Sequence, residues 1–241
     1  MTELNAVVIP AFNEADRLPA LLNSCIRQLP ADALCLIINN ASTDATEDII
    51  RRYTLSDGRV VGIFEDNKGI GSARQRGLAW CKGNDINIAV TTDADCIIRN
   101  SKWFGEHVTA LNRPNIACTI GPIKYIPDEV NPPFTDNLYL YLYSFLANSR
   151  RRVKAMSSNV HASGANMGFR INDAINVGGY NAQLNLGEDS DLAAKLARYG
   201  DLHFTQEPIL TSPRRLKGQG IFQSIIGKFL GDYSRTRLNF R

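Results

Sequence analysis

The sequence has 241 residues, of which 44% are hydrophobic and 21% are charged. These proportions are typical of a globular protein, and they exclude a disordered chain, a collagen-like repeat and a small disulfide-rich scaffold. The formal net charge is only +3, which is too small to indicate wholesale nucleic-acid binding, so we expect no nucleic-acid partner.

The first half of the chain repeats one pattern. Four short apolar runs, at residues 6–9, 34–38, 60–64 and 86–90, alternate with segments whose apolar side chains recur at helical spacing. Such alternation predicts a parallel sheet with helices on both faces. We therefore expect an α/β protein with a Rossmann-like, mostly parallel sheet in a single domain.

Polar and acidic residues follow each apolar run, at residues 10–14, 39–44, 66–69 and 93–95. In parallel sheets, ligands gather outside the carboxyl ends of the strands. Asp93 and Asp95 can share a divalent cation and a sugar hydroxyl there, because Mg²⁺ and Mn²⁺ prefer oxygen ligands. A lone DxD often indicates only a solvated turn, but its place after a strand favours a ligand site.

The second half is less regular. Residues 127–133 contain three prolines and predict a loop. Residues 137–147 predict a helix, whose tyrosines either pack in the core or line an acceptor groove. A helix that begins near Gly187 is expected to end before Gly200, as a C′ glycine.

The end of the chain is basic. From Ser212 to Arg241 there are seven basic residues and one acid. Apolar side chains between Ile221 and Leu230 form a stripe at helical spacing. This stripe would pack on the domain, form a dimer seam or rest on an anionic membrane surface. We place the domain at residues 1–215 and a basic amphipathic segment at residues 216–241.

Cysteine usage and hydropathy indicate the compartment. The five cysteines form no CxxC pair, so we expect buried thiols in a reducing compartment and no zinc site. The N-terminal residues lack the features of a signal peptide. The most apolar stretch, residues 138–147, is too short to span a bilayer. We expect a cytoplasmic protein, peripheral at the inner face of the membrane if the C-terminal stripe meets lipid.

Several motifs together resemble those of glycosyltransferase family 2, which has the GT-A fold. They occur in the order and at the spacing typical of that family, between about residues 5 and 215. The matching segments are VIPAFNE at 8–14, NNASTD at 39–44, DNKGIGSAR at 66–74, DAD at 93–95, GANMGFR at 164–170, VGGY at 177–180, GED at 187–189 and TSPRR at 211–215.

The resemblance implies a nucleoside diphosphate sugar donor, UDP-linked, bound by the half at residues 1–123. Phe12 stands where the family often has Tyr, and Asn40 stands where many members have Asp. An amide can pair with uracil or with another base, so the sequence does not decide which nucleobase is bound. Arg74 would otherwise be a charge on a helix surface. The implied donor-side residues are Pro10, Phe12 and Glu14 in the nucleoside pocket, Asn40 at the base, Asp93 at the ribose or sugar, Asp95 with Asp93 at Mn²⁺ or Mg²⁺, and Lys68, Arg74, Arg214 and Arg215 at the diphosphate.

The resemblance also implies an inverting mechanism, with Asp189 as general base. Its carboxylate would take the proton of an acceptor hydroxyl as that oxygen attacks the anomeric carbon. A free Asp has a pKa of about 3.9, so this base is expected to be ionised at neutral pH without tuning. Otherwise Asp189 merely favours a helix N-terminus. Residues 124–215 would bind the acceptor, through Gly164, Asn166 and Glu188.

Two other functions are compatible with parts of the sequence. A nucleotidyltransferase would also use acidic metal ligands, but it needs a glycine- and lysine-rich phosphate loop, whereas residues 11–14 are acidic. A non-catalytic sugar-nucleotide-binding module would not need the intact set of Asp93, Asp95 and Asp189. The acceptor is open between a glycan, a lipid-linked molecule and a small molecule, and a homodimer is also open.

Overall fold

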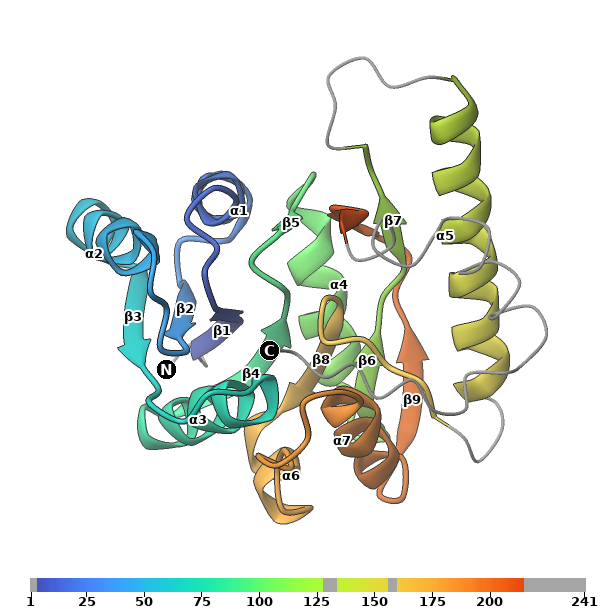
Figure 1. Ribbon diagram of the computed structural model, residues 1–241. Coiled ribbons are helices and arrows are strands. Elements are labelled where there is room, and N and C mark those ends of the chain that lie inside the picture. The colour runs from blue at the N-terminus through green and yellow to red at the C-terminus, as the bar shows by residue number, and fades with distance from the viewer. Residues whose placement is uncertain (1–3, 128–133, 156–159, 215–241) are drawn as a thin grey trace.

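The computed structural model describes residues 4–127, 134–155 and 160–214, and its centre is a seven-stranded sheet with helices on both faces (Figure 1). The four strands predicted in the first half are confirmed, and a helix follows each of the first three. These elements are β1 (Leu4–Ala11), α1 (Leu18–Gln28), β2 (Ala33–Asn39), α2 (Thr46–Ser56), β3 (Val60–Phe64), α3 (Ile70–Gly83) and β4 (Ile86–Thr91).

The sheet is mostly parallel, as predicted, with one reversal. Its strand order is β3-β2-β1-β4-β8-β6-β9, and β8 runs antiparallel to both β4 and β6. Because β6 and β9 are parallel to each other, their carboxyl ends lie at the same edge as that of β4. The added elements are α4 (Lys102–Leu111), β6 (Ile116–Ile120), β8 (Met167–Arg170), α6 (Ile171–Asn176), α7 (Glu188–Leu196) and β9 (Asp201–Phe204).

Both faces of the sheet are buried. Successive side chains of a strand point to opposite faces, so Val7 and Ile9 pack with α1, α2 and α4, whereas Ala6 and Val8 pack with α3, α6 and α7. The unbroken apolar runs of the first half are therefore explained by helices on both faces.

A smaller sheet lies beside the main one, in the order β5-β10-β7. Its strands are β5 (Cys96–Ile97), β7 (Ile123–Tyr125) and β10 (Ile209–Thr211). The helix expected at residues 137–147 is part of α5 (Phe134–Ala155), which lies at the outer edge of the molecule beside β7 (Figure 1). Its tyrosines divide, since Tyr143 is buried and Tyr141 is exposed.

The prediction that Gly200 is a C′ glycine is wrong. Helix α7 ends at Leu196 with Ala197 as its C-cap. A Cβ at position 200 would come within 2.7 Å of the Asn115 carbonyl oxygen, so this glycine permits a close approach of two chain segments.

All five cysteines are unpaired and buried, as expected. Among the described residues, no helix is long and apolar enough to cross a membrane. Residues 128–133 of the predicted loop, Arg215 and the segment at residues 216–241 with its apolar stripe lie outside the described part of the chain.

Candidate active site

Two of the loops at the carboxyl edge of the sheet are fastened to each other. The Glu14 backbone N–H donates to Thr46 Oγ1 at 2.9 Å, and the Ala15 N–H donates to Asp44 Oδ2 at 3.1 Å. Asn13 accepts a hydrogen bond from the Thr43 N–H at 2.8 Å. These hydrogen bonds join the loop after β1 to the loop after β2, so Asn13, Thr43 and Asp44 of the two motifs serve to hold the loops in place.

The expected nucleoside side of the site has one open aromatic ring. Phe12 is 48% exposed, and Lys68 Nζ lies 5.8 Å from the centre of its ring. Pro10 is buried in β1. An exposed ring is suited to stack on a nucleobase, and a cation beside it is suited to meet the phosphates of the same nucleotide.

Asn40 does not face open space, contrary to the expectation that it faces the base. Its side-chain N–H groups donate to the carbonyl oxygens of Glu65 and Asn67, at 3.2 and 2.7 Å, and its Oδ1 accepts the Gly69 N–H at 2.8 Å. The amide is thereby committed to the loop after β3. Asn40 positions the loop that carries Lys68.

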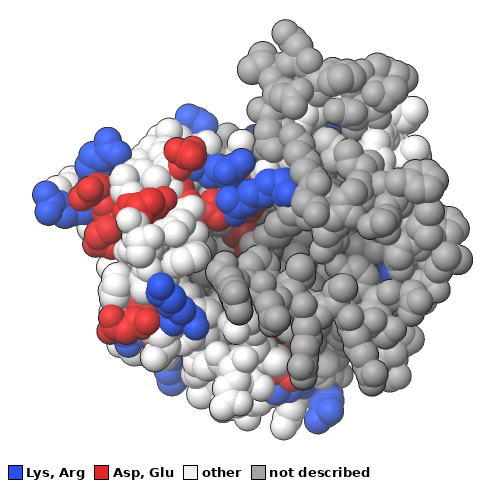
Figure 2. Space-filling view, in the orientation of Figure 1, with Lys and Arg blue, Asp and Glu red and all other residues white. Residues whose placement is uncertain are grey.

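Glu14 and Asp95 share one guanidinium group. Arg214 forms an ion pair with Glu14, and its Nε lies 3.2 Å from Asp95 Oδ2. The other Glu14 carboxylate oxygen, Oε2, is buried without a hydrogen-bond partner among the described residues. Arg214 was expected at the diphosphate, but the structure places its guanidinium against the carboxylates of Glu14 and Asp95. Figure 2 shows acidic and basic side chains adjoining near the middle of this face.

The chemistry of these side chains fits a hard divalent cation. Asp93, Asp95 and Glu14 offer only oxygen atoms, one of them buried and unpartnered. No group of three or more His, Cys, Asp or Glu side chains within the described ranges forms a metal site by itself. Mg²⁺ nevertheless commonly uses one or two carboxylates together with substrate phosphates.

Arg74 is the centre of the site. Its side chain is only 2% exposed, and its Nη2 lies 2.8 Å from Asp93 Oδ1. Its Nε lies 3.2 Å from Glu188 Oε1 and 3.1 Å from Asp189 Oδ1. Burial lowers the pKa of Arg74, but the nearby Asp189, Asp93 and Glu188 carboxylates outweigh burial and raise the pKa above its ordinary value.

The contacts of Arg74 correct two expectations. With three carboxylates around it, Arg74 is neither a surface charge nor free to neutralise a diphosphate. It joins Asp93, which follows β4, to the Glu188–Asp189 pair that begins α7. Donor-side and acceptor-side motifs, far apart in the sequence, therefore share one buried cation.

Asp189 is held from two sides and is not an ordinary Asp. The Gly164 N–H donates to its Oδ2 at 2.7 Å. Burial raises its pKa to about 7, against the opposing effect of Arg74. The expectation of a base that is ionised without tuning is therefore wrong. A base with a pKa near neutrality has a stronger affinity for the proton it must accept.

The backbone around Asp189 depends on glycine. Gly187, directly before α7, has φ +83°, a left-handed conformation that glycine adopts without strain. A Cβ at Gly164 would collide with the Arg74 guanidinium and with Asp189 Oδ1. Gly164 thus allows the loop before β8 to approach the carboxylate closely.

Asn166, expected to touch the acceptor, is fully buried. Its Oδ1 accepts hydrogen bonds from Trp103 Nε1 at 2.9 Å and His107 Nε2 at 2.8 Å. Its Nδ2 donates to the Pro122 carbonyl oxygen at 2.8 Å. Burial lowers the pKa of His107 to about 4, so the ring is neutral. Asn166 fixes the start of β8 against α4 and cannot reach an acceptor in this conformation.

Sequence reasoning assigned no role to the Tyr180 side chain. Its hydroxyl is buried without a hydrogen-bond partner among the described residues, close enough to Arg74 to affect its pKa. Burial raises the pKa of Tyr180, so it is a neutral donor beside the carboxylates. The VGGY motif was visible in the sequence, but its contact with α3 depends on tertiary packing.

Residues 6–178, which are more than half of the chain, match the family model described as "Glycosyl transferase family 2". The chain belongs to glycosyltransferase family 2. Its match includes the motifs after β1, β2, β3 and β4, and the loop before β8 that contacts Asp189.

Curated relatives of this family 2 chain are similar over part of its length. Glycosyltransferase GlyA of Streptococcus pneumoniae is 30% identical over 87 residues, which are 36% of this chain and 12% of that protein. A PGL/p-HBAD biosynthesis glycosyltransferase of Mycobacterium bovis is 31% identical over 107 residues, which are 42% of each chain. The aligned stretches thus span less than half of these relatives.

Solved structures confirm the GT-A fold expected from the sequence. Mannosyltransferase PcManGT of Pyrobaculum calidifontis, in complex with GDP-Man and Mn²⁺, aligns with a TM-score of 0.65 at 17% identity, over 98% of this chain and 66% of that one. S. aureus TarS 1-349 in complex with UDP-GlcNAc aligns with a TM-score of 0.63 at 17% identity, over 87% and 58%.

Proposed function

We propose that this family 2 protein transfers a sugar from a nucleoside diphosphate sugar, UDP-linked, to an acceptor hydroxyl, with inversion and with a divalent metal ion. One observation carries the proposal. Arg74 holds Asp93 at the end of β4 and Asp189 at the start of α7, so a donor-side carboxylate and a candidate base have a fixed separation. Such preorganisation is what a displacement at a sugar carbon needs.

The donor would lie across the carboxyl edge of the first half, residues 1–123. Phe12 would stack on the base, and Lys68, beside it, would meet the phosphates. The proteins of similar fold that bind GDP-Man and UDP-GlcNAc support a sugar nucleotide as the donor class. The uridine assignment rests on the family resemblance, since Asn40 is committed to the loop after β3.

Asp95 and Asp93 would hold Mn²⁺ or Mg²⁺, with Glu14 adjoining. When bound, such an ion offsets the negative charge that grows on the departing diphosphate. In the described structure Arg214 supplies the positive charge beside Asp95. The guanidinium would be free to turn to the phosphates once the Asp95 carboxylate has another cation, because Arg binds phosphate well.

Asp189 would accept the acceptor proton. Its Oδ2 is fixed by the Gly164 N–H, so the carboxylate keeps one orientation while the acceptor oxygen attacks the anomeric carbon. The hydroxyl proton passes to the carboxylate, the new carbon–oxygen bond forms, and the bond to the diphosphate breaks. The acceptor would lie in the half at residues 124–215, with Glu188 as a neighbour of the base.

A transfer assay with the full chain tests the proposal. The anomeric configuration of the product is read by NMR, and inversion is expected. Asp189→Asn should lower turnover by about 10²–10⁴-fold while nucleotide affinity is retained. Asp191→Asn is the matched control on the same helix, because Asp191 pairs with Lys195 at 2.7 Å. Equal effects of the two substitutions would show that Asp189 is not the base.

A further inference from the structure

Helix α5 is fastened to the molecule by one face only. Its Asn148 exchanges two hydrogen bonds with the backbone of Ile123 in β7, at 3.0 and 2.9 Å. Its Ser144 hydroxyl accepts the Tyr125 backbone N–H at 3.0 Å. Leu140 and Tyr143 are buried on the same side. This inner face accounts for how α5 stays in place.

The opposite face of α5 is apolar and open. Large hydrophobic side chains recur along it at intervals of three and four residues, which places them on one side of a helix. Tyr141 and Phe145 are 62% and 61% exposed. Six of the eleven large hydrophobic side chains that are exposed within the described ranges lie on this helix: Leu138, Tyr141, Leu142, Phe145, Leu146 and Val153. We call these six residues the α5 stripe.

A stripe of this kind is typical of a binding surface. Single exposed hydrophobic residues are normal, but a contiguous apolar patch marks a contact with another molecule or a membrane. The α5 stripe is contiguous over two turns, from Leu138 to Leu146. None of its members is needed for the hydrogen bonds to β7.

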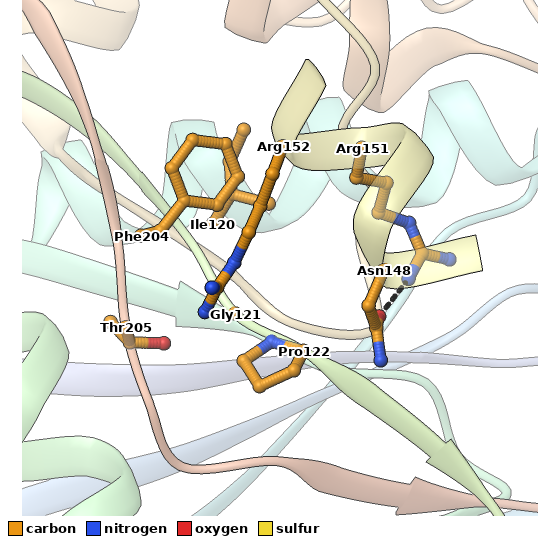
Figure 3. Close-up of a pocket in the computed structure, with 8 residues that line it drawn as sticks. All are labelled: Ile120, Gly121, Pro122, Asn148, Arg151, Arg152, Phe204 and Thr205. Carbon is orange, nitrogen blue, oxygen red and sulfur yellow. Dashed lines mark hydrogen bonds between the residues drawn. The ribbon is translucent and has the colours of Figure 1, made fainter. Parts of the chain in front are cut away.

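The charges next to the stripe indicate which partner fits. Helix α5 contains one acid, Asp136 in its first turn, and four basic residues near its C-terminal end: Arg150, Arg151, Arg152 and Lys154. Arg151 is used internally, since it is buried and donates to Asn148 Oδ1 at 2.8 Å. Figure 3 shows this hydrogen bond and shows the Arg152 side chain lining a pocket beside Phe204. Arg152 is exposed.

A helix with Leu, Phe and Tyr on one face and a cluster of basic residues at its C-terminal end fits the interface of an anionic bilayer. Aromatic rings favour the headgroup level, apolar side chains enter the acyl boundary, and Lys and Arg are attracted to anionic lipid.

We propose that the α5 stripe binds the interfacial region of an anionic lipid bilayer and, with the basic residues that follow it, holds the protein at the membrane surface. The helix lies in the plane of the interface and does not cross it. The proposal does not depend on glycosyl transfer, so it can fail while the proposed function stands, and the reverse.

Vesicle flotation of the full chain tests the proposal. The protein is mixed with phosphatidylcholine vesicles, with and without phosphatidylglycerol, at low and high salt. Binding is expected to need the anionic lipid and to weaken with salt. Leu142→Asp with Phe145→Asp should lower the partition coefficient by at least about tenfold, because two apolar side chains that would enter the bilayer are lost. Arg150→Gln with Arg152→Gln should lower the partition coefficient by about fivefold for each basic residue removed.

A matched control lies elsewhere on the surface. Leu55, on α2, is 81% exposed, and Leu55→Asp should leave flotation unchanged. No flotation of the unmodified protein would overturn the proposal. Flotation that survives the α5 substitutions would also overturn it, since the segment at residues 216–241 would then be sufficient. A dimer that these substitutions dissociate would assign the stripe to a second copy of the chain instead.

A second measurement avoids the risk that an Asp substitution unfolds α5. All native cysteines are buried, so Tyr141→Cys can be labelled selectively with an environment-sensitive dye. Its emission should shift to the blue when anionic vesicles are added, while the same dye at Leu55→Cys should not respond. An identical response at both positions, or none at Tyr141→Cys, would overturn the proposal.

Discussion

Replacing Arg74 by Met removes the one cation that the structure places among three carboxylates. Arg74 lies within 3.2 Å of Asp93, Glu188 and Asp189, and its side chain is 2% exposed. Breaking a buried ion pair by removing one partner costs about 3–5 kcal/mol, because the other charge stays buried and uncompensated. For a chain of this size, that lowers the Tm by roughly 6–20 °C.

The loss should depend on pH. The folded pKa of Asp189 is about 7, above the ordinary value of about 3.8, so the folded state binds its proton more tightly than the unfolded state does. Ionisation of Asp189 therefore lowers the free energy of unfolding as the pH rises from about 3.8 to about 7. Without Arg74 the cost of ionisation grows, so Arg74→Met should destabilise more at pH 8 than at pH 5.

The assay is thermal unfolding of the wild type and of Arg74→Met, each at pH 5 and at pH 8. Arg76→Met is the matched control, since Arg76 lies on the same helix and is exposed. Arg74→Lys keeps the charge without the forked geometry, so its Tm should fall between those of the wild type and Arg74→Met. A Tm for Arg74→Met equal to that of Arg76→Met, or a loss independent of pH, would refute the account of Arg74.

Three further predictions concern the same region. The value of kcat/KM should rise with pH and level off above about 7, as Asp189 ionises; an acid limb that persists in Asp189→Asn would assign it to another group. Gly164→Ala should lower both turnover and nucleotide affinity, because its methyl group collides with Asp189 and with the Arg74 guanidinium that pairs with Asp93; unchanged turnover would contradict this. Asn166→Leu should destabilise by about 2–6 kcal/mol in chemical unfolding, because Trp103 and His107 each lose an acceptor at about 1–3 kcal/mol per group; an unchanged midpoint would be evidence against it.

The first half of the fold was accessible from the sequence because its signals are local. Strands β1 to β4 are short apolar runs, and the residues that follow them, such as Asp93 and Asp95, must meet at one edge of a parallel sheet. Strand β8 was not predicted as an antiparallel insertion, since its pairing with β4 and β6 is set by partners distant in the chain.

The candidate site was accessible only as a set of residues. Asp189, Glu188, Asp93 and Arg74 were all named, and the structure brings them together. Their roles depend on contacts that no local pattern reports. Arg74 and Glu188 are 114 positions apart, and the raised pKa of Asp189 results from burial. Asn40 is a similar case, because its amide is committed to backbone groups of another loop.

Calorimetric titration with UDP, GDP and dTDP, each with and without Mn²⁺, tests the central claim most directly. The account predicts that UDP binds, that its binding needs the metal, and that Asp95→Ala removes the metal dependence while Asp191→Asn does not. Binding of another nucleotide in the same metal-dependent way would correct the donor. Absence of binding by all three nucleotides would contradict a sugar-nucleotide site at this edge of the sheet.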